Sequence, residues 1–194
     1  LAVDALNTGF SFLLRRMLAD YGLGNDDYEL VPVGAPGARW AAMQSGDCAA
    51  SLLNKAIARI AIAEGCRELR PSIDPWVIYQ GGVYCARRDW AAANAEIVRG
   101  FIRATVAAVD WCLAPAHRAE LPALLMQHLP HMTQPAAEAA ASELPSLLLP
   151  GLPISRDGFQ VVLDLRATYG TPPMTLGDAE KYLDLSYYDT ALGL

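Results

Sequence analysis

Histidines and cysteines are the first candidates for chemistry in this 194-residue chain. His128 and His131 lie three residues apart, but Pro130 stands between them and would break the helix that a two-histidine metal site needs. The four cysteines are widely separated, and none forms the CxxC pair that is typical of structural zinc. These patterns favour surface histidines, small buried cysteines and no metal site, and they leave open one disulfide of unassigned pairing.

Motifs for nucleophilic catalysis or nucleotide binding do not occur in the sequence. GxSxG, GxxxxGK[ST] and GxGxxG are all absent. The acidic pairs Asp26/Asp27 and Asp184/Asp189 fall in a predicted turn and a predicted terminal helix, where solvated surface is their usual role. The residues taken by themselves therefore predict no catalytic group.

Loops rich in glycine and amide side chains are more informative. Residues 7–9, residues 34–39 and Asn54 each follow a predicted strand and precede a predicted helix. Free N–H groups at helix starts bind anions or polar oxygens, so these loops predict a ligand site at one sheet edge. Capping and turn formation alone would also explain the same residues, and both interpretations stay open. Arg39 could bind an anionic ligand through two hydrogen bonds from its guanidinium. It could also be a surface residue paired with a nearby acid, and this second case is the more common one.

Alternating strands and helices are predicted to position these loops. In the first third of the chain we expect strands at residues 1–6, 28–33 and 48–53, and helices at residues 10–21, 38–44 and 54–65. Asn7 or Thr8 can cap the first helix, and Gly22 can end it. Short strand–helix alternation predicts a parallel sheet with helices on its faces, so the loops would share one edge.

The rest of the chain is predicted to be helical. Residues 76–86 read as an extended stretch, in which Gly81 and Gly82 allow a bend or a change of sheet. Further helices are expected at residues 94–113, 118–129, 133–144, 155–169 and 180–192, with Thr133 and Ser155 as caps. The sequence therefore predicts an α/β fold in the N-terminal part of the chain and a helical region in the C-terminal part.

Composition excludes several classes of protein. The chain carries 15 Lys+Arg against 21 Asp+Glu, and 53% of its residues are apolar, which excludes a disordered chain. A pI near 5.0 argues against nucleic acid as a partner. No apolar run reaches the ~18–20 residues that span a bilayer. The mean hydropathy of +0.19 is high for a domain that stands alone, and we interpret the chain as a fragment or a mature product.

Several short runs together resemble one known family. They are VDALNTGF at residues 3–10, YELVPVG at 28–34, RWAAMQSG at 39–46, ASLLN at 50–54, YQGGVY at 79–84, RRDW at 87–90, KYLD at 181–184 and the tyrosines at 187–188. The pattern resembles the second lobe of solute-binding proteins of the NMT1/THI5-like family, which includes nitrate, sulfonate, taurine and thiamine-precursor binding proteins. The resemblance consists of many short matches along nearly the whole chain and contains no single diagnostic motif.

The resemblance implies a type II periplasmic-binding-protein fold, in which two α/β lobes joined by a hinge hold a ligand between them. Residues 1–78 would form lobe two as a three-layer α/β/α ligand-binding domain. Residues 79–86 would be the hinge crossover. Residues 87–194 would be a C-terminal helical region that packs on lobe one and across both lobes. The first half of lobe one would be missing.

The implied function is that of a solute-binding receptor of an ABC importer. The receptor would capture a small polar or anionic molecule (a sulfonate, nitrate or a pyrimidine-like compound), close about its hinge and deliver the molecule to a membrane permease. It would be a monomer in the periplasm or another extracytoplasmic space, without cofactor, catalysis or nucleic acid. Carried over by position, the ligand contacts would be Asn7, Thr8, Gly9, Phe10, Gly37, Arg39, Asn54 and Tyr79. Tyr79, Phe10 and Trp40 are the aromatic side chains that could stack on a ring.

Two other functions compete with transport. An enzyme on the same fold, desulfinase-like or thiamine-pyrimidine-synthase-like, would need an activated nucleophile such as a cysteine beside a base. Cys48 lies at the wrong end of its predicted strand for that role. A sensor domain of a transcription factor would need a helix-turn-helix before residue 1, and the long helical region argues against it.

Overall fold

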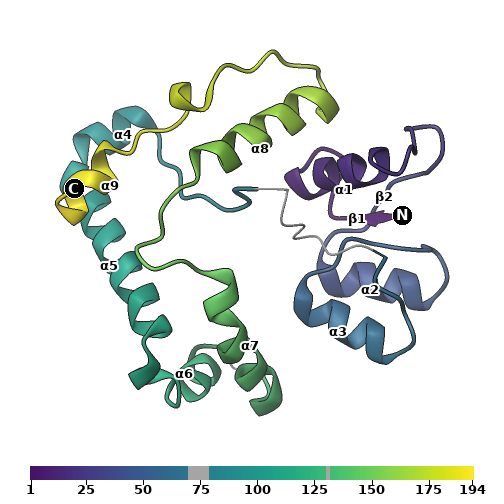
Figure 1. Ribbon diagram of the computed structural model, residues 1–194, viewed down its shortest axis with the longest axis horizontal. Coiled ribbons are helices and arrows are strands. Elements are labelled where there is room, and N and C mark those ends of the chain that lie inside the picture. The colour runs from purple at the N-terminus through teal and green to yellow at the C-terminus, as the bar shows by residue number, and fades with distance from the viewer. Residues whose placement is uncertain (70–78, 130–131) are drawn as a thin grey trace. The chain divides into compact units, whose positions relative to one another are not determined.

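The computed structural model describes residues 1–69, 79–129 and 132–194, and the chain divides into two units (Figure 1). Unit 1 consists of Leu1–Gly82 and Ser155–Lys181, and unit 2 of Val83–Ile154 and Tyr182–Leu194. The chain therefore passes from one unit to the other three times. Residues 155–181, which the sequence pattern groups with the C-terminal helical region, belong to unit 1.

Unit 1 is built on a small parallel sheet. Strand β1 (Ala2–Val3) pairs in parallel with β2 (Val31–Pro32). The third expected strand is reduced to an isolated parallel bridge between Ala2 and Ser51. Parallel pairing is thus confirmed, but the regular strands are much shorter than the predicted runs of six residues. Pro32 has no N–H to donate to a ladder, which limits β2.

The described residues of unit 1 also contain four α-helices: α1 (Gly9–Ala19), α2 (Pro36–Gln44), α3 (Lys55–Ala63) and α8 (Arg156–Tyr169). Helix α1 packs on α8, and α2 packs on α3 and β1. Figure 1 shows α1 on one side of the strands and α2 and α3 on the other. Phe12 and Leu13 of α1 are buried with Leu165 of α8. The mixed helix–strand order predicted for this part of the chain is confirmed, and each helix begins and ends within about two residues of its expected position.

All regular elements in the described residues of unit 2 are helices. It contains α4 (Arg88–Ala93), α5 (Ala95–Leu113), the 3-10 helix η1 (Pro115–His117), α6 (Leu121–His128), α7 (Gln134–Leu147) and α9 (Ser186–Leu192). Helices α6 and α7 pack as a hairpin, and α5 packs against α9 and α7. None of the helices in the described ranges combines the length and apolarity that crossing a bilayer requires.

Three expectations for the chain after residue 75 differ from the structure. The helix predicted at residues 180–192 is replaced by a 3-10 helix, η2 (Ala179–Lys181), and by α9, because the chain leaves unit 1 after Lys181. Thr133 precedes α7 but makes no capping hydrogen bond through its side chain. Of the extended stretch at residues 76–86, residues 76–78 lie outside the described residues, and residues 79–86 form no regular strand.

Candidate ligand site

Three parallel segments of unit 1 end at a common edge. The N–H of Val31 donates to the carbonyl of Leu1 at 2.9 Å, and the N–H of Val33 donates to the carbonyl of Val3 at 2.8 Å. On the other side of β1, the N–H of Ala2 donates to the carbonyl of Ala50 at 2.9 Å. Because all three segments run in the same direction, the loops that lead into α1, α2 and α3 leave from the same edge of the sheet. The shared edge expected from the sequence is therefore present.

Thr8 is the cap of α1. Its Oγ1 accepts the backbone N–H of Ser11 at 3.3 Å and donates to Oδ1 of Asp4 at 2.7 Å. The choice between Asn7 and Thr8 as cap is thereby decided in favour of Thr8. Asp4 places a carboxylate beside the start of the helix, where the helix dipole favours negative charge.

The starts of α2 and α3 differ in how they satisfy their free N–H groups. Oδ1 of Asn54 accepts the N–H of Ile57 at 3.0 Å and caps α3. Helix α2 has no side-chain cap and begins with Pro36. A Cβ atom added to Gly37 would meet no atom within 4 Å, so open space lies beside the first turn of α2.

Arg39 is a buried cation in the first part of α2, with only 5% of its surface exposed. Its Nη1 donates to the carbonyl oxygen of Leu52, one residue beyond the bridge at Ser51. Its Nε is buried without a hydrogen-bond partner, and no carboxylate in the described ranges forms an ion pair with it. The interpretation of Arg39 as a surface residue paired with an acid is therefore wrong. A buried guanidinium without a counter-charge is costly, and an anion would relieve that cost.

Tyr79 lies over the start of α1. A Cβ atom added to Gly9 would be 2.3 Å from the Tyr79 hydroxyl oxygen, so only glycine leaves room for this side chain. The ring packs against the cluster of Phe12, Leu13 and Leu165. Burial raises the pKa of the Tyr79 phenol, and the negative charge of Asp4 raises it further. The hydroxyl therefore stays protonated and can donate a hydrogen bond at neutral pH.

The other predicted contacts have different surroundings. Both polar ends of the Asn7 side chain bind the backbone of Thr171. Phe10 is 52% exposed, which leaves its ring open to a ligand. Trp40 is buried like its neighbour Arg39, with 9% of its surface exposed.

Sequence reasoning missed two residues at this edge. Asp4 follows β1 directly and lies four residues before the Thr8 cap. An acidic residue so close to an expected helix start could have been recognised in the sequence as a partner of the cap. Thr171 had no such signal, because it lies 164 positions from Asn7 in the chain.

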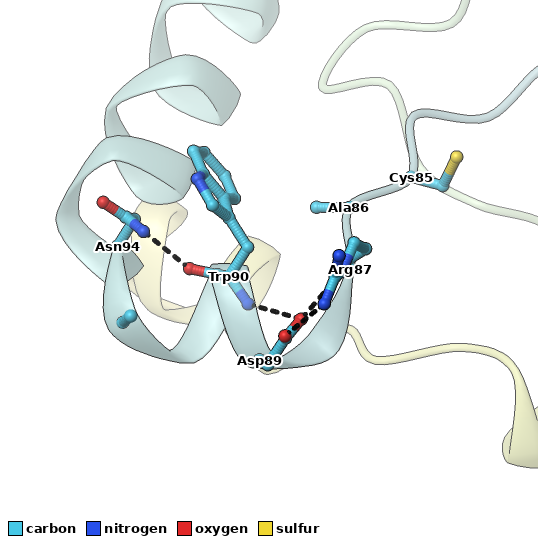
Figure 2. A pocket seen from close by; sticks show the side chains of 7 residues that line it. Cys85, Ala86, Arg87, Asp89, Trp90 and Asn94 are labelled. Atoms are coloured by element: carbon cyan, nitrogen blue, oxygen red, sulfur yellow. Dashed lines mark hydrogen bonds and ion pairs between the residues drawn. The ribbon is translucent and has the colours of Figure 1, made fainter.

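Unit 2 contains a hollow of about 620 Å³, which Figure 2 shows from close by. It is lined by Cys85, Ala86, Arg87, Asp89, Trp90, Ala93 and Asn94. The guanidinium of Arg87 binds both oxygens of Asp89 at 3.1 and 2.6 Å and holds the pKa of that carboxyl below its usual range. Because these charges satisfy each other, the hollow offers no unpaired charge to a ligand.

Metal and thiol chemistry have little basis in the described part of the chain. There, no group of three or more His, Cys, Asp or Glu side chains is placed to hold a metal ion. His131 lies outside the described residues. All four cysteines are free, and Cys48 is buried while Cys85 is exposed.

Comparison with known proteins identifies the family. Neither the curated proteins nor the solved structures contain a match to this chain. The family profile described as NMT1/THI5 like matches residues 7–119, more than half of the chain. The matched range begins at the loop before α1 and includes the amino ends of α1, α2 and α3. The chain therefore belongs to the NMT1/THI5-like family.

Proposed function

We propose that this chain binds a small polar or anionic molecule at the shared loop edge of unit 1 and passes it to the permease of an ABC importer. The family is commonly one of solute-binding proteins for nitrate and sulfonate transport, and its members are typically extracytoplasmic. A sulfonate, nitrate or a pyrimidine-like compound is the proposed cargo. The proposed receptor works as a monomer in the periplasm or another extracytoplasmic space.

The buried Arg39 is the observation that carries the proposal. Its Nε has no protein partner, and its Nη1 is held at the carbonyl of Leu52, beside the edge from which α3 starts. The amino ends of α2 and α3 leave from the same edge and add partial positive charge, whereas the start of α1 already faces the carboxylate of Asp4. An anion or an oxygen-rich group bound at this edge would offset the charge of the guanidinium. Thr8, Gly9, Phe10, Gly37, Asn54 and Tyr79 are the further proposed contacts.

The proposed mechanism is capture followed by closure. In the type II periplasmic-binding-protein fold that we propose, residues 1–78 act as lobe two and residues 79–86 as the hinge crossover. Residues 87–194 pack on lobe one and across both lobes. Closure buries the ligand and presents a new surface to the permease, with no bond made or broken.

A thermal-shift screen against nitrate, sulfonates, carboxylates, pyrimidines and nucleobases tests the proposal. At a ligand concentration about 100 times Kd, binding adds about 2.7 kcal/mol of stability. For a chain of this length, that stabilisation corresponds to a rise in Tm of about 5–10 °C. The ligand should be recovered unchanged. A rise in Tm that is equally large in the Arg39→Met variant would contradict the proposed site.

The same incubation distinguishes transport from catalysis. Some members of the family are synthases, so an enzyme of desulfinase-like or thiamine-pyrimidine-synthase-like type is the alternative. Mass spectrometry of the recovered compound would reveal a product if the chain were an enzyme. Conversion of any compound in the screen at a rate proportional to protein concentration would overturn the receptor proposal.

A further inference from the structure

A single side chain fastens the segment after α8 to the loop before α1. Nδ2 of Asn7 donates to the carbonyl oxygen of Thr171 at 2.6 Å, and the N–H of Thr171 donates to Oδ1 of Asn7 at 2.9 Å. Because the carboxamide binds both backbone groups of one residue, it fixes the orientation of Thr171 as well as its position.

The segment that carries Thr171, residues 170–181, is also held along α8. Nη1 of Arg166 donates to the carbonyl of Pro172 at 3.3 Å, and Oε1 of Gln160 accepts the N–H of Ala179 at 2.8 Å. Figure 1 shows this segment running back beside α8 toward η2. Residues 171–174 remain exposed at the end of the segment where Asn7 binds. The segment is thus fixed at several points and presents a defined surface there.

We propose that this segment forms a wall of the ligand site, with Thr171 contacting the ligand through its hydroxyl and Asn7 acting as a positioning residue. The inference rests on the proposed function, because it concerns the same loop edge. Asn7 directly precedes the Thr8 cap, so Thr171 lies at the start of α1. Both backbone groups of Thr171 are taken by Asn7, which leaves its exposed side chain to meet the ligand. The facing ligand atom is an oxygen or a nitrogen, since only these exchange a strong hydrogen bond with a hydroxyl.

Binding measurements on designed variants of the whole chain test this inference. The probes are nitrate, ethanesulfonate and 4-aminopyrimidine, titrated by calorimetry. Thr171→Val keeps the shape of the side chain and removes the hydroxyl, so Kd should rise about three- to tenfold, the value of one hydrogen bond. Thr171→Ser restores the hydroxyl and should bind nearly as well as the unaltered chain. Asn25→Ala is the matched control, because Asn25 makes one side-chain hydrogen bond in a turn of the same unit.

A double-mutant cycle separates positioning from direct contact. Asn7→Ala should raise Kd and speed hydrogen exchange at the Thr171 amide, which loses its acceptor. If Asn7 acts through Thr171, then adding Thr171→Val to Asn7→Ala should raise Kd little further. If Asn7 touches the ligand independently, the two fold-changes multiply, and that result would overturn its positioning role.

The remaining outcomes also decide between the two proposals. Binding by the unaltered chain that Thr171→Val leaves unchanged would overturn this inference and leave the proposed function standing. Failure of the unaltered chain to bind any of the three probes would contradict the proposed function, and this inference with it.

Discussion

Replacing Gly9 by alanine should destabilise unit 1, although the same change stabilises most helices. A Cβ atom at this position would lie 2.3 Å from the hydroxyl oxygen of Tyr79 and 3.6 Å from its Cζ atom. The second distance is an ordinary van der Waals contact, whereas the first is far too short. The clash therefore comes from one oxygen atom, and Tyr79 must move to relieve it.

The size of the effect follows from two opposing contributions. The higher helix propensity of alanine favours the variant by up to about 1 kcal/mol, because Gly9 is the first residue of α1. Adding a methyl group to a packed site costs about 1–3 kcal/mol. The Tyr79 ring packs against Phe12, Leu13 and Leu165, so it cannot move without disturbing this cluster. We therefore expect Gly9→Ala to lower the free energy of unfolding by about 1 kcal/mol.

Urea denaturation of two further variants checks this reasoning. Tyr79→Phe removes the oxygen, so in that background Gly9→Ala should raise the free energy of unfolding. Gly37→Ala is the control, because Gly37 lies in the first turn of α2 in the same unit and a Cβ there meets nothing within 4 Å. It should stabilise by up to about 1 kcal/mol. Stabilisation of the original chain by Gly9→Ala, to the extent seen with Gly37→Ala, would refute the predicted clash with Tyr79.

Three further predictions concern the same edge. Asn54→Ala removes the cap of α3 and should lower the free energy of unfolding by about 1 kcal/mol in urea denaturation, whereas Asn54→Ser should retain most of it. Arg39→Met removes an unpaired buried charge and also the bond to the Leu52 carbonyl, so its free energy of unfolding should change by less than about 1 kcal/mol. Whichever compound of the screen raises the Tm of the original chain should no longer raise the Tm of this variant. The raised pKa of Tyr79 means that the folded chain holds this proton more tightly than the unfolded chain does. The contribution of this proton to the free energy of unfolding should therefore be fully present below pH 10.0 and should be lost as pH rises through the folded pKa. In urea denaturation at several pH values, Tyr79→Phe should reduce the fall in the free energy of unfolding at high pH.

Helix positions and most helix caps in unit 1 could be predicted from the sequence, because they depend on neighbouring residues. Ser155 caps α8 as predicted, and Thr8, one of two candidates, caps α1. Asn54 caps α3, which was one of the two interpretations left open for it, whereas the predicted cap Thr133 makes no such bond. A capping bond spans only three residues, so its donor and acceptor are visible in a short stretch of sequence. The same locality explains why helix positions in unit 1 were predicted well.

Features that depend on distant residues were not predictable in the same way. Arg39 follows a surface-like pattern in its own helix, and only the approach of the Leu52 carbonyl shows that it is buried. Thr171 reaches the loop before α1 because α8 packs on α1, a pairing that no periodic pattern encodes. The shortness of the strands likewise depends on pairing across the sheet, since an apolar run shows only that a strand is permitted.

The packing of α8 on α1 has a consequence for synthesis of the protein. The partners Asn7 and Thr171 are 164 positions apart, so a ribosome working at about 5–20 residues per second needs on the order of 10–30 s to deliver the second after the first. During that interval Phe12 and Leu13 have no Leu165 to cover them. The nascent chain therefore passes through a long period in which an apolar face is open to chaperones or to aggregation. A slow codon or a pause between residues 13 and 165 would lengthen that exposure without altering a single amino acid.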